Sequence, residues 1–259
     1  MALKVIQIPL LQDNYGYLIF CTETGEAAVV DTPEAGPILK RLKAEKLELK
    51  KIFNTHHHLD HVGGNDAILE VYPNVDVLAY ESDANRIPGI TKGLRHGDRV
   101  QLGAEVFRVL FTPGHTSGHI SYYNEAAKRL FCGDVLMGGG CGRLFEGTPE
   151  QMVMSLINTI GKLPRDTLCY CGHEYTEINL SFAITVEPRN VKTKVRLLET
   201  KQLRAKNIPT VPFTLEVEWQ TNPFLRLDAP EVQAFARSKG AAEDCVSIFA
   251  AVRIAKDSF

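Results

Sequence analysis

The densest group of side chains able to bind a metal ion lies in residues 54–65, Asn-Thr-His-His-His-Leu-Asp-His-Val-Gly-Gly-Asn. Four of the eight histidines occupy positions 56–61, together with Asp60. Alternate residues of an extended segment point the same way, so His56 and His58 can present their rings to one ion. Asp60 and His61 follow at a turn, where they can face a second ion. The spacing predicts a metal site for Zn²⁺, with Fe²⁺ or Mn²⁺ tolerated.

Three further candidate ligands each follow a β-rich run. His115 comes after residues 105–111, Asp134 after residues 129–132, and His173 after residues 167–171. Ligands from several strand ends that converge on one edge of a sheet make a rigid site. The predicted ligand set is His56, His58, Asp60, His61, His115, Asp134 and His173.

The other histidines and the two cysteines of the Cys-x-Cys sequence at 169–171 are not predicted to bind metal. His57 points away from its neighbours and is predicted to support the site from its outer shell or to be structural. His96 lies in a turn-like segment and is predicted to be a surface residue. His119, four residues after His115, is predicted to support a ligand rather than to bind the metal. Cys169 and Cys171 alternate across a strand and are predicted to be buried thiols.

Strand and helix signals alternate over residues 1–174. A helix near 33–46 begins at Thr32-Pro33, and another begins with a capping box at residues 148–151. Nine β-rich runs are predicted: 3–8, 17–21, 27–31, 51–54, 75–79, 105–111, 120–123, 129–132 and 167–171. From residue 175 only helices are expected, among them 190–206 and one from 228 to about 240. The predicted domains are 1–174, an α/β domain with mixed sheets covered by helices, and 175–259, a helical domain.

The composition excludes several classes of protein. The chain has 259 residues, of which 44% are hydrophobic and 23% are charged, and this composition excludes disordered and collagenous chains. Its net charge of −2 gives no strong positive potential to attract nucleic acid or anionic membranes. No run of about 18 apolar residues occurs. Six cysteines and an N-terminus without a signal peptide predict a cytoplasmic protein. A mitochondrial isoform is the alternative. We expect a monomer whose partner is a small-molecule substrate. The basic stretch 189–206 is predicted to be a solvated helix face.

The motif His56-x-His58-x-Asp60-His61, with the three downstream ligands, resembles the metallo-β-lactamase superfamily. This resemblance covers about residues 1–174 and implies a four-layer αβ/βα sandwich. Members of this superfamily cleave lactams, thioesters, phosphodiesters and other bonds, so the fold alone does not give the function.

The second half narrows the resemblance to glyoxalase II, the hydroxyacylglutathione hydrolases. The segments that carry it are 171–176 (CGHEYT), 187–190 (EPRN), 222–226 (NPFLR) and 252–257 (VRIAKD). It implies a small all-helical C-terminal domain and hydrolysis of S-D-lactoylglutathione to glutathione and D-lactate, the second step of methylglyoxal detoxification. It also implies two metal ions, one on His56, His58 and His115, the other on Asp60, His61 and His173, with Asp134 bridging.

The same resemblance implies the residues that contact substrate. Arg253 and Lys256, on one face of the last helix, bind glutathione, and Tyr175 matches a substrate-contact tyrosine. In the matching substrate loop many relatives carry lysine and tyrosine where this chain has Arg143 and Phe145; Arg143 keeps the charge, whereas Phe145 lacks the hydroxyl donor. The hypothesis for the mechanism is attack by a metal-bridging hydroxide, with Asp60 and Asp134 as the catalytic carboxylates.

Other functions compete with this one. A glutathione persulfide dioxygenase with a single iron would use a related scaffold, but the C-terminal domain and the basic pair argue against it. A β-lactamase would need a secretion signal, and a nuclease an inserted domain and a basic groove. A catalytically silent metal-binding regulatory protein is the alternative from another class, which the complete ligand set disfavours.

Overall fold

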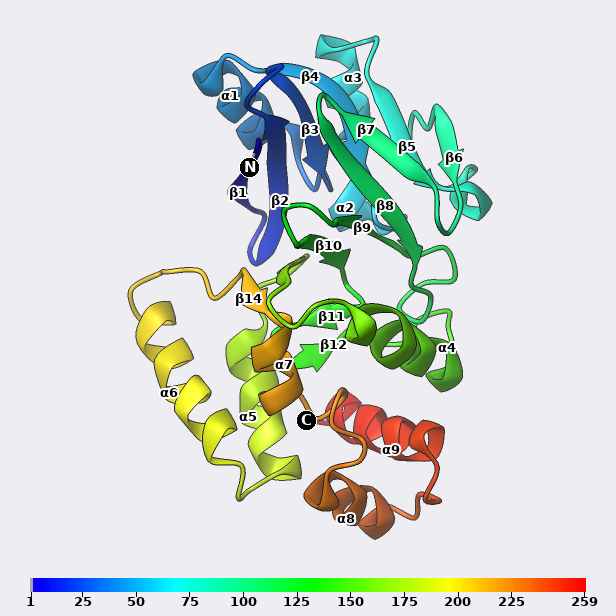
Figure 1. Ribbon diagram of the computed structural model, residues 1–259, viewed down its shortest axis with the longest axis vertical. Coiled ribbons are helices and arrows are strands. Elements are labelled where there is room, and N and C mark those ends of the chain that lie inside the picture. Colours follow the sequence, from blue (N-terminus) through cyan, green and yellow to red (C-terminus); the bar gives the residue numbers. More distant parts are fainter. Residues whose placement is uncertain (1) are drawn as a thin grey trace. The chain divides into compact units, whose positions relative to one another are not determined.

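The computed structural model describes residues 2–259 (Figure 1). By internal contacts the chain divides into two compact units. The first contains Met1–Phe111 and Gly118–Gly133, and the second contains Thr112–Ser117 and Asp134–Phe259. The boundary predicted at residue 174 follows the change from α/β to helical sequence, which is a different criterion, and it stays a prediction.

The first unit contains two sheets. In chain and spatial order the first sheet consists of β1 (Leu3–Leu10), β2 (Asn14–Cys21), β3 (Glu26–Val30), β4 (Glu48–Phe53), β5 (Asp76–Tyr80) and β6 (Lys92–Leu94). Strands β1 to β3 are antiparallel, whereas β3 to β6 are parallel. The strands of the second sheet that lie in this unit are antiparallel: β7 (Arg99–Leu102), β8 (Glu105–Phe111), β9 (Ile120–Asn124) and β10 (Arg129–Gly133).

Helices cover one face of the first sheet. They are α1 (Ala35–Glu45), the single turn α2 (Leu59–Val62) and α3 (Asn65–Val71), with a 3₁₀ turn at Glu81–Asp83. Ile38 and Leu42, four residues apart on α1, and Ile68 on α3 are fully buried against Val29 and Ile52 of the sheet. The spacing of the two α1 residues places both on one helical face, which is why this helix packs flat on the strands.

The other face of the first sheet packs against the second sheet. Phe53 of β4 stacks on Tyr122 of β9 with ring centres 4.7 Å apart, and its edge meets Phe107 of β8 at 5.4 Å. Strand β8 alternates as this packing requires: Phe107 and Val109 are fully buried, while Val106 is exposed. The unit is therefore a helix–sheet–sheet stack, three successive layers of the predicted sandwich.

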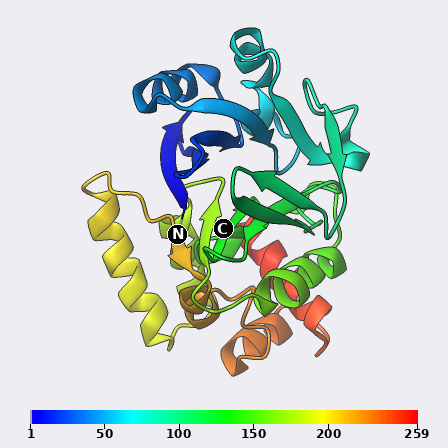
Figure 2. The ribbon, with the colours of Figure 1, turned by 45° about the horizontal axis from the view of Figure 1, so that its top comes forward.

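The second unit is mainly helical. Its elements are β11 (Leu136–Met137), β12 (Gly140–Cys141), α4 (Pro149–Val153), β13 (Leu168–Cys171), α5 (Thr176–Val186), α6 (Val191–Arg204), β14 (Phe213–Thr214), α7 (Leu215–Thr221), α8 (Pro230–Ser238) and α9 (Cys245–Asp257). A π-helical turn at Met154–Thr159 and a 3₁₀ turn at Ile160–Lys162 prolong α4. The predicted capping box at Thr148 is present. Helices α8 and α9, brown and red in Figure 2, pack together.

One element departs from the all-helical expectation after residue 175. The two-residue strand β14 pairs with β13, so that Phe213 lies beside Cys169. A strand this short carries no sequence pattern of its own and forms only because β13 offers it a partner edge. Among the described residues no helix is long and apolar enough to span a bilayer.

Candidate metal centre and active site

Four predicted ligands lie together in the first unit, at the end of β4. Nε2 of His56 lies 3.1 Å from Nδ1 of His58, and Nε2 of His61 lies 3.8 Å from Oδ2 of Asp60. The rings of His56 and His61 are 4.1 Å apart. His58 is the extended residue before α2, which turns the chain so that the donors before and after it gather on one side.

A buried carboxylate that the sequence analysis did not single out orients two of these ligands. Asp31 directly follows β3 and accepts hydrogen bonds from Thr55 N and Thr55 Oγ1, both at 2.8 Å, and from His61 Nδ1 at 2.8 Å. Since the Thr55 hydroxyl donates to Asp31, it accepts from Nδ1 of His56 at 3.0 Å. Both imidazoles therefore carry their lone pair on Nε2, the tautomer that binds a metal through that atom.

A sequence signal for Asp31 does exist. It ends an apolar run, and β3 and β4 are parallel neighbours, so the residues after each strand meet at one edge. Asp31 has φ of 54°, a left-handed conformation that aspartate tolerates better than most residues. A charged residue at the end of a buried strand, next to a histidine-rich strand end, is the pattern to search for.

The other three predicted ligands lie together in the second unit. Oδ2 of Asp134 is 3.2 Å from Nε2 of His173 and 3.5 Å from Nε2 of His115. Nδ1 of His115 donates to the carbonyl oxygen of Arg143 at 2.8 Å, which again leaves the lone pair on Nε2. All three side chains are at least nine-tenths buried.

These donors fit divalent metal ions. The rings of His56, His61 and His115 each have Nδ1 hydrogen-bonded to an oxygen and Nε2 turned toward a second potential ligand. The separations of 3.1–3.5 Å match the edge of about 3.3 Å between two ligands on one ion with bonds near 2.0 Å. Groups of three ligand atoms within 4.8 Å of one another occur among these histidines and aspartates. The protein can therefore bind metal ions through its His and Asp side chains.

The remaining histidines lie where the sequence analysis predicted. His57 lies 3.4 Å from the buried carboxylate of Asp83. His96 is exposed, and its Nδ1 accepts from the amide of Phe111 at 3.1 Å. His119 is fully buried, and its ring stacks on that of His56 at 5.1 Å. It supports a predicted ligand by packing.

Two predicted substrate residues, Tyr175 and Phe145, lie against predicted ligands in the second unit, and a third, Arg143, lies beside Phe145. Tyr175 stacks on His173, with ring centres 4.8 Å apart and planes 8° apart. Phe145 is 60% exposed and meets the His115 ring edge-on at 5.3 Å. The guanidinium of Arg143 lies 6.0 Å from the Phe145 ring centre. An exposed aromatic ring beside a buried ligand is suited to contact a substrate.

The two basic residues predicted on α9, Arg253 and Lys256, differ in exposure. Arg253 is buried: Nη1 donates to the carbonyl oxygen of Cys141 at 2.8 Å, and Nη2 to Oδ1 of Asp257 at 2.9 Å. Lys256 is half-buried, with its ammonium 5.5 Å from the Phe182 ring centre. Burial and the nearby Arg253 charge lower its pKa. A substrate carboxylate would therefore meet the Lys256 ammonium more readily than the Arg253 guanidinium.

The cysteines give a test of this packing. Five of the six are buried, including Cys169 and Cys171, as predicted, whereas Cys245 is exposed. Burial raises the pKa of the Cys141 thiol to about 11, so that its reactive thiolate is scarce at pH 7. We expect a thiol reagent to label about one cysteine per native chain and six after denaturation. Cys245→Ser is the control and should remove the native label; two rapidly labelled thiols in the native protein would contradict the packing.

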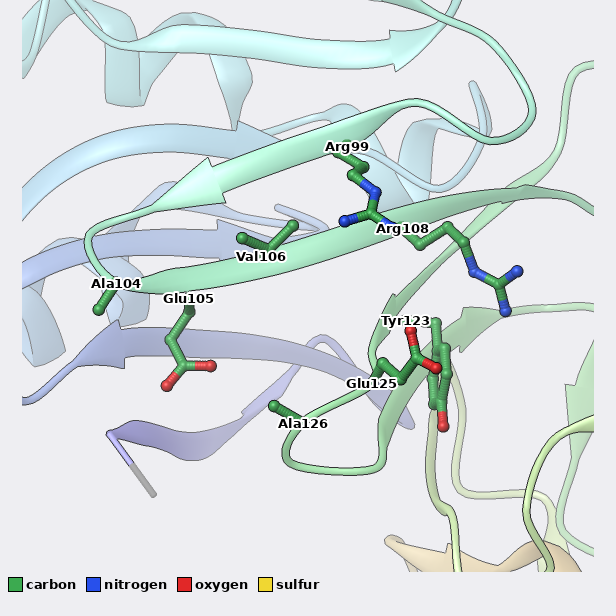
Figure 3. A pocket seen from close by; sticks show the side chains of 8 residues that line it. All are labelled: Arg99, Ala104, Glu105, Val106, Arg108, Tyr123, Glu125 and Ala126. Atoms are coloured by element: carbon green, nitrogen blue, oxygen red, sulfur yellow. The ribbon is translucent and has the colours of Figure 1, made fainter.

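A pocket outside these groups lies on the second sheet of the first unit (Figure 3). Arg99 and Arg108 pair across β7 and β8, and their guanidinium groups point apart in this view. Glu105 and Glu125 also line it, and the carboxylate of Glu105 accepts from Asn124 Nδ2 at 2.7 Å. The lining side chains carry charges of both signs and diverge, so they do not converge on a single ligand. No predicted site residue lines this pocket.

Comparison with known proteins gives the family. Residues 13–173 match the family model of the metallo-beta-lactamase superfamily, and residues 174–259 match that of the hydroxyacylglutathione hydrolase C-terminus. The hydroxyacylglutathione hydrolase of a Synechococcus species is 49% identical, with 99% of this chain and 100% of that protein covered. The chain belongs to the hydroxyacylglutathione hydrolase family. The Rhodospirillum rubrum member is 45% identical, with 100% of this chain and 99% of that protein covered.

Family membership confirms the predicted fold class and the predicted type of enzyme. The hydroxyacylglutathione hydrolase C-terminal match favours the hydrolase over the dioxygenase and the silent regulatory protein. Among solved structures, ETHE1 from Myxococcus xanthus is similar with a TM-score of 0.68 and 25% identity, covering 98% of this chain and 90% of that one. The chain is thus a hydrolase of the metallo-beta-lactamase superfamily.

Proposed function

We propose that this hydroxyacylglutathione hydrolase cleaves the thioester of S-D-lactoylglutathione, and of other 2-hydroxyacylglutathiones, to glutathione and the free hydroxy acid. The observation that carries the proposal is the match of residues 174–259 to the hydroxyacylglutathione hydrolase C-terminus. The metal donors alone do not choose among the substrates of a large superfamily, whereas this second match does.

The proposed metal ligands are the seven predicted side chains. His56, His58 and His115 would hold one divalent ion, Asp60, His61 and His173 the other, and Asp134 would contact both. The set of five imidazoles and two carboxylates favours zinc, with iron or manganese as alternatives. When bound, two such ions supply an acidified water and Lewis-acid polarisation of a carbonyl group. Support comes from the orientation of the donors within each unit.

The chain's own residues have three tasks in this proposal. Asp31 and Thr55 hold the rings of His61 and His56 in one tautomer, so these two rings need not reorient during the reaction. Phe145 and Tyr175 provide apolar walls beside the ligands. Lys256 attracts a glutathione carboxylate. Arg143, whose Nε donates to Oδ1 of Asp257 at 3.2 Å, adds a second positive charge near the end of α9. The leaving group is a thiolate, whose conjugate acid has a pKa near 8.5, so the hydrolysis needs no general acid.

The test is hydrolysis of S-D-lactoylglutathione by the purified protein, before and after treatment with a chelator, with metal content measured in parallel. We expect kcat/KM in the range of about 10⁴–10⁸ M⁻¹s⁻¹, loss of activity on chelation and recovery on adding zinc. If glutathione release is followed with a thiol reagent, the Cys245→Ser variant removes the background from the exposed cysteine.

The competing functions give different results in the same experiment. Oxygen uptake with glutathione persulfide and one iron per chain would replace the hydrolase by a dioxygenase. Retained metal with no turnover of either substrate would revive a regulatory role. Hydrolysis of simple thioesters as fast as S-D-lactoylglutathione would overturn the glutathione-specific part of the proposal.

A further inference from the structure

A glycine-rich segment, Gly138 to Gly142, connects two parts of the candidate site in the second unit. It follows the predicted ligand Asp134 by four residues and immediately precedes Arg143, whose carbonyl oxygen accepts from Nδ1 of His115. At its other face the carbonyl oxygen of Cys141 accepts from Arg253 of α9. The position of this segment therefore sets the position of a metal ligand and of a substrate-binding helix at once.

The segment has a single side chain of its own, that of Cys141, whose sulfur accepts from Arg253 Nη1 at 3.7 Å, because its other four residues are glycine. A Cβ atom at Gly139 would lie 2.7 Å from the Leu180 side chain, and one at Gly142 would lie 2.1 Å from the carbonyl oxygen of Asp134. Gly139 also has φ of 68°. The chain passes too close to its neighbours for any larger residue, so other residues must fix its backbone.

Buried polar side chains from α7 and α5 supply these anchors. Glu218 accepts from the amide of Gly139 at 3.0 Å, and Asn222 donates Nδ2 to the carbonyl oxygen of Gly140 at 2.9 Å. Asn179 donates to the carbonyl oxygen of Gly138 at 3.2 Å. The peptide group between Gly138 and Gly139 is thus held at its carbonyl by Asn179 and at its amide by Glu218, and the peptide group after Gly140 is held by Asn222.

The anchors are themselves held in place. Asn222 Nδ2 also donates to Oε2 of Glu218 at 2.8 Å, and Nη2 of Arg196 on α6 lies 2.6 Å from Oε1 of Glu218. Glu218 and Asn222 are fully buried. A fully satisfied buried network of this kind is rigid, and its charge is paired. None of the hydrogen bonds made by the Glu218 and Asn222 side chains goes to a predicted metal ligand.

We propose that Glu218 and Asn222 are positioning residues for the reaction. They fix the Gly138–Gly142 segment and thereby the orientation of His115 and the position of the Cys141 carbonyl oxygen that binds Arg253. The inference rests on the proposed function. It gives a role to the Asn222-Pro223-Phe224 motif, which lies outside the predicted ligand set. Asn222 acts through the segment and touches neither metal nor substrate.

The test compares two asparagine-to-alanine variants. Asn222→Ala removes the donor to Gly140 and one partner of Glu218. The matched control is Asn190→Ala at the start of α6, where the side chain caps Thr193 N at 3.2 Å and donates to Gln220 O at 3.0 Å. Asn222→Ala also removes the acceptor of Phe224 N at 3.0 Å, so it loses three side-chain hydrogen bonds and the control loses two. Only Asn222→Ala removes a hydrogen bond to the glycine segment.

Three readouts separate positioning from general stability. For Asn222→Ala we expect faster amide exchange in a peptide covering residues 138–143, metal loss at about tenfold lower chelator concentration, and kcat/KM lower by about 10–100-fold. Asn190→Ala should lower the melting temperature yet leave all three within about twofold of the wild type. Equal effects of the two variants on exchange and metal retention would overturn the proposal.

A second variant covers the case in which Asn222→Ala does not fold. Asn179→Ala removes only the bond to Gly138 and should change the three readouts in the same direction by a smaller factor; no change in the exchange of 138–143 would overturn the proposal. Amide exchange and metal retention do not depend on the substrate. If the wild type fails to hydrolyse S-D-lactoylglutathione, the proposed function fails while these two readouts still test the positioning.

Discussion

Replacement of Asp134 by asparagine is expected to reduce bound metal from the two ions proposed per chain to one or fewer and to lower kcat/KM by at least about 100-fold. Asp134 Oδ2 faces Nε2 of both His115 and His173, at 3.5 and 3.2 Å. The amide removes the negative charge that two cations would share, and its NH₂ group cannot act as a ligand. Elemental analysis of the dialysed protein and the hydrolysis assay measure the two effects.

The control for this variant is Asp228→Asn, an exposed carboxylate in the same unit. It makes the same chemical change and should leave metal content and kcat/KM within about twofold of the wild type. Should Asp134→Asn retain two ions and full activity, Asp134 would not contact both metals.

Replacement of Asp31 by alanine is expected to have the second large effect, on both stability and activity. It leaves Thr55 N, Thr55 Oγ1 and His61 Nδ1 buried without their acceptor. Unsatisfied buried donors cost about 1–3 kcal/mol each, so the free energy of unfolding should fall by at least about 3 kcal/mol. The released His61 ring should lower metal affinity by about 10–100-fold. Urea unfolding and chelator titration measure the two losses.

Asp31→Asn separates these effects. Asparagine tolerates the left-handed backbone of this residue and can still accept from Thr55 N, so most of the stability should remain. Its single acceptor oxygen cannot also serve His61 Nδ1, so metal retention should still fall. Wild-type metal retention in Asp31→Asn would show that Asp31 supports the fold and does not orient His61.

The sequence predicted the local parts of this protein well, for identifiable reasons. The run 105–111 became β8 with the same bounds, and the helix predicted near 33–46 became α1 at Ala35–Glu45, because alternation and helical spacing are properties of neighbouring residues. The capping box at Thr148 formed for the same reason. Strands β6, β7, β11, β12 and β14 were not predicted, since two to four residues carry no readable pattern and depend on a partner strand.

The sequence by itself determined the candidate ligands, since imidazole and carboxylate chemistry is readable from residue type and the spacing His-x-His-x-Asp-His. It also determined the family through segments spread along the whole chain. The tertiary structure decided which tautomer His56, His61 and His115 adopt. Asp31 accepts from His61 and from the Thr55 hydroxyl that holds His56, the Arg143 carbonyl accepts from His115, and both acceptors come from distant positions in the chain.

The tertiary structure likewise decided that Arg253 is buried on a carbonyl oxygen while Lys256 is half-exposed, although their spacing places both on one helical face. It decided that Glu218, which looks like a surface residue in the sequence, is a fully buried anchor. In each case a deciding partner lies far away in the chain, Cys141 for Arg253 and Gly139 for Glu218. The energy of a buried hydrogen bond or charge depends on that partner, which no local pattern encodes.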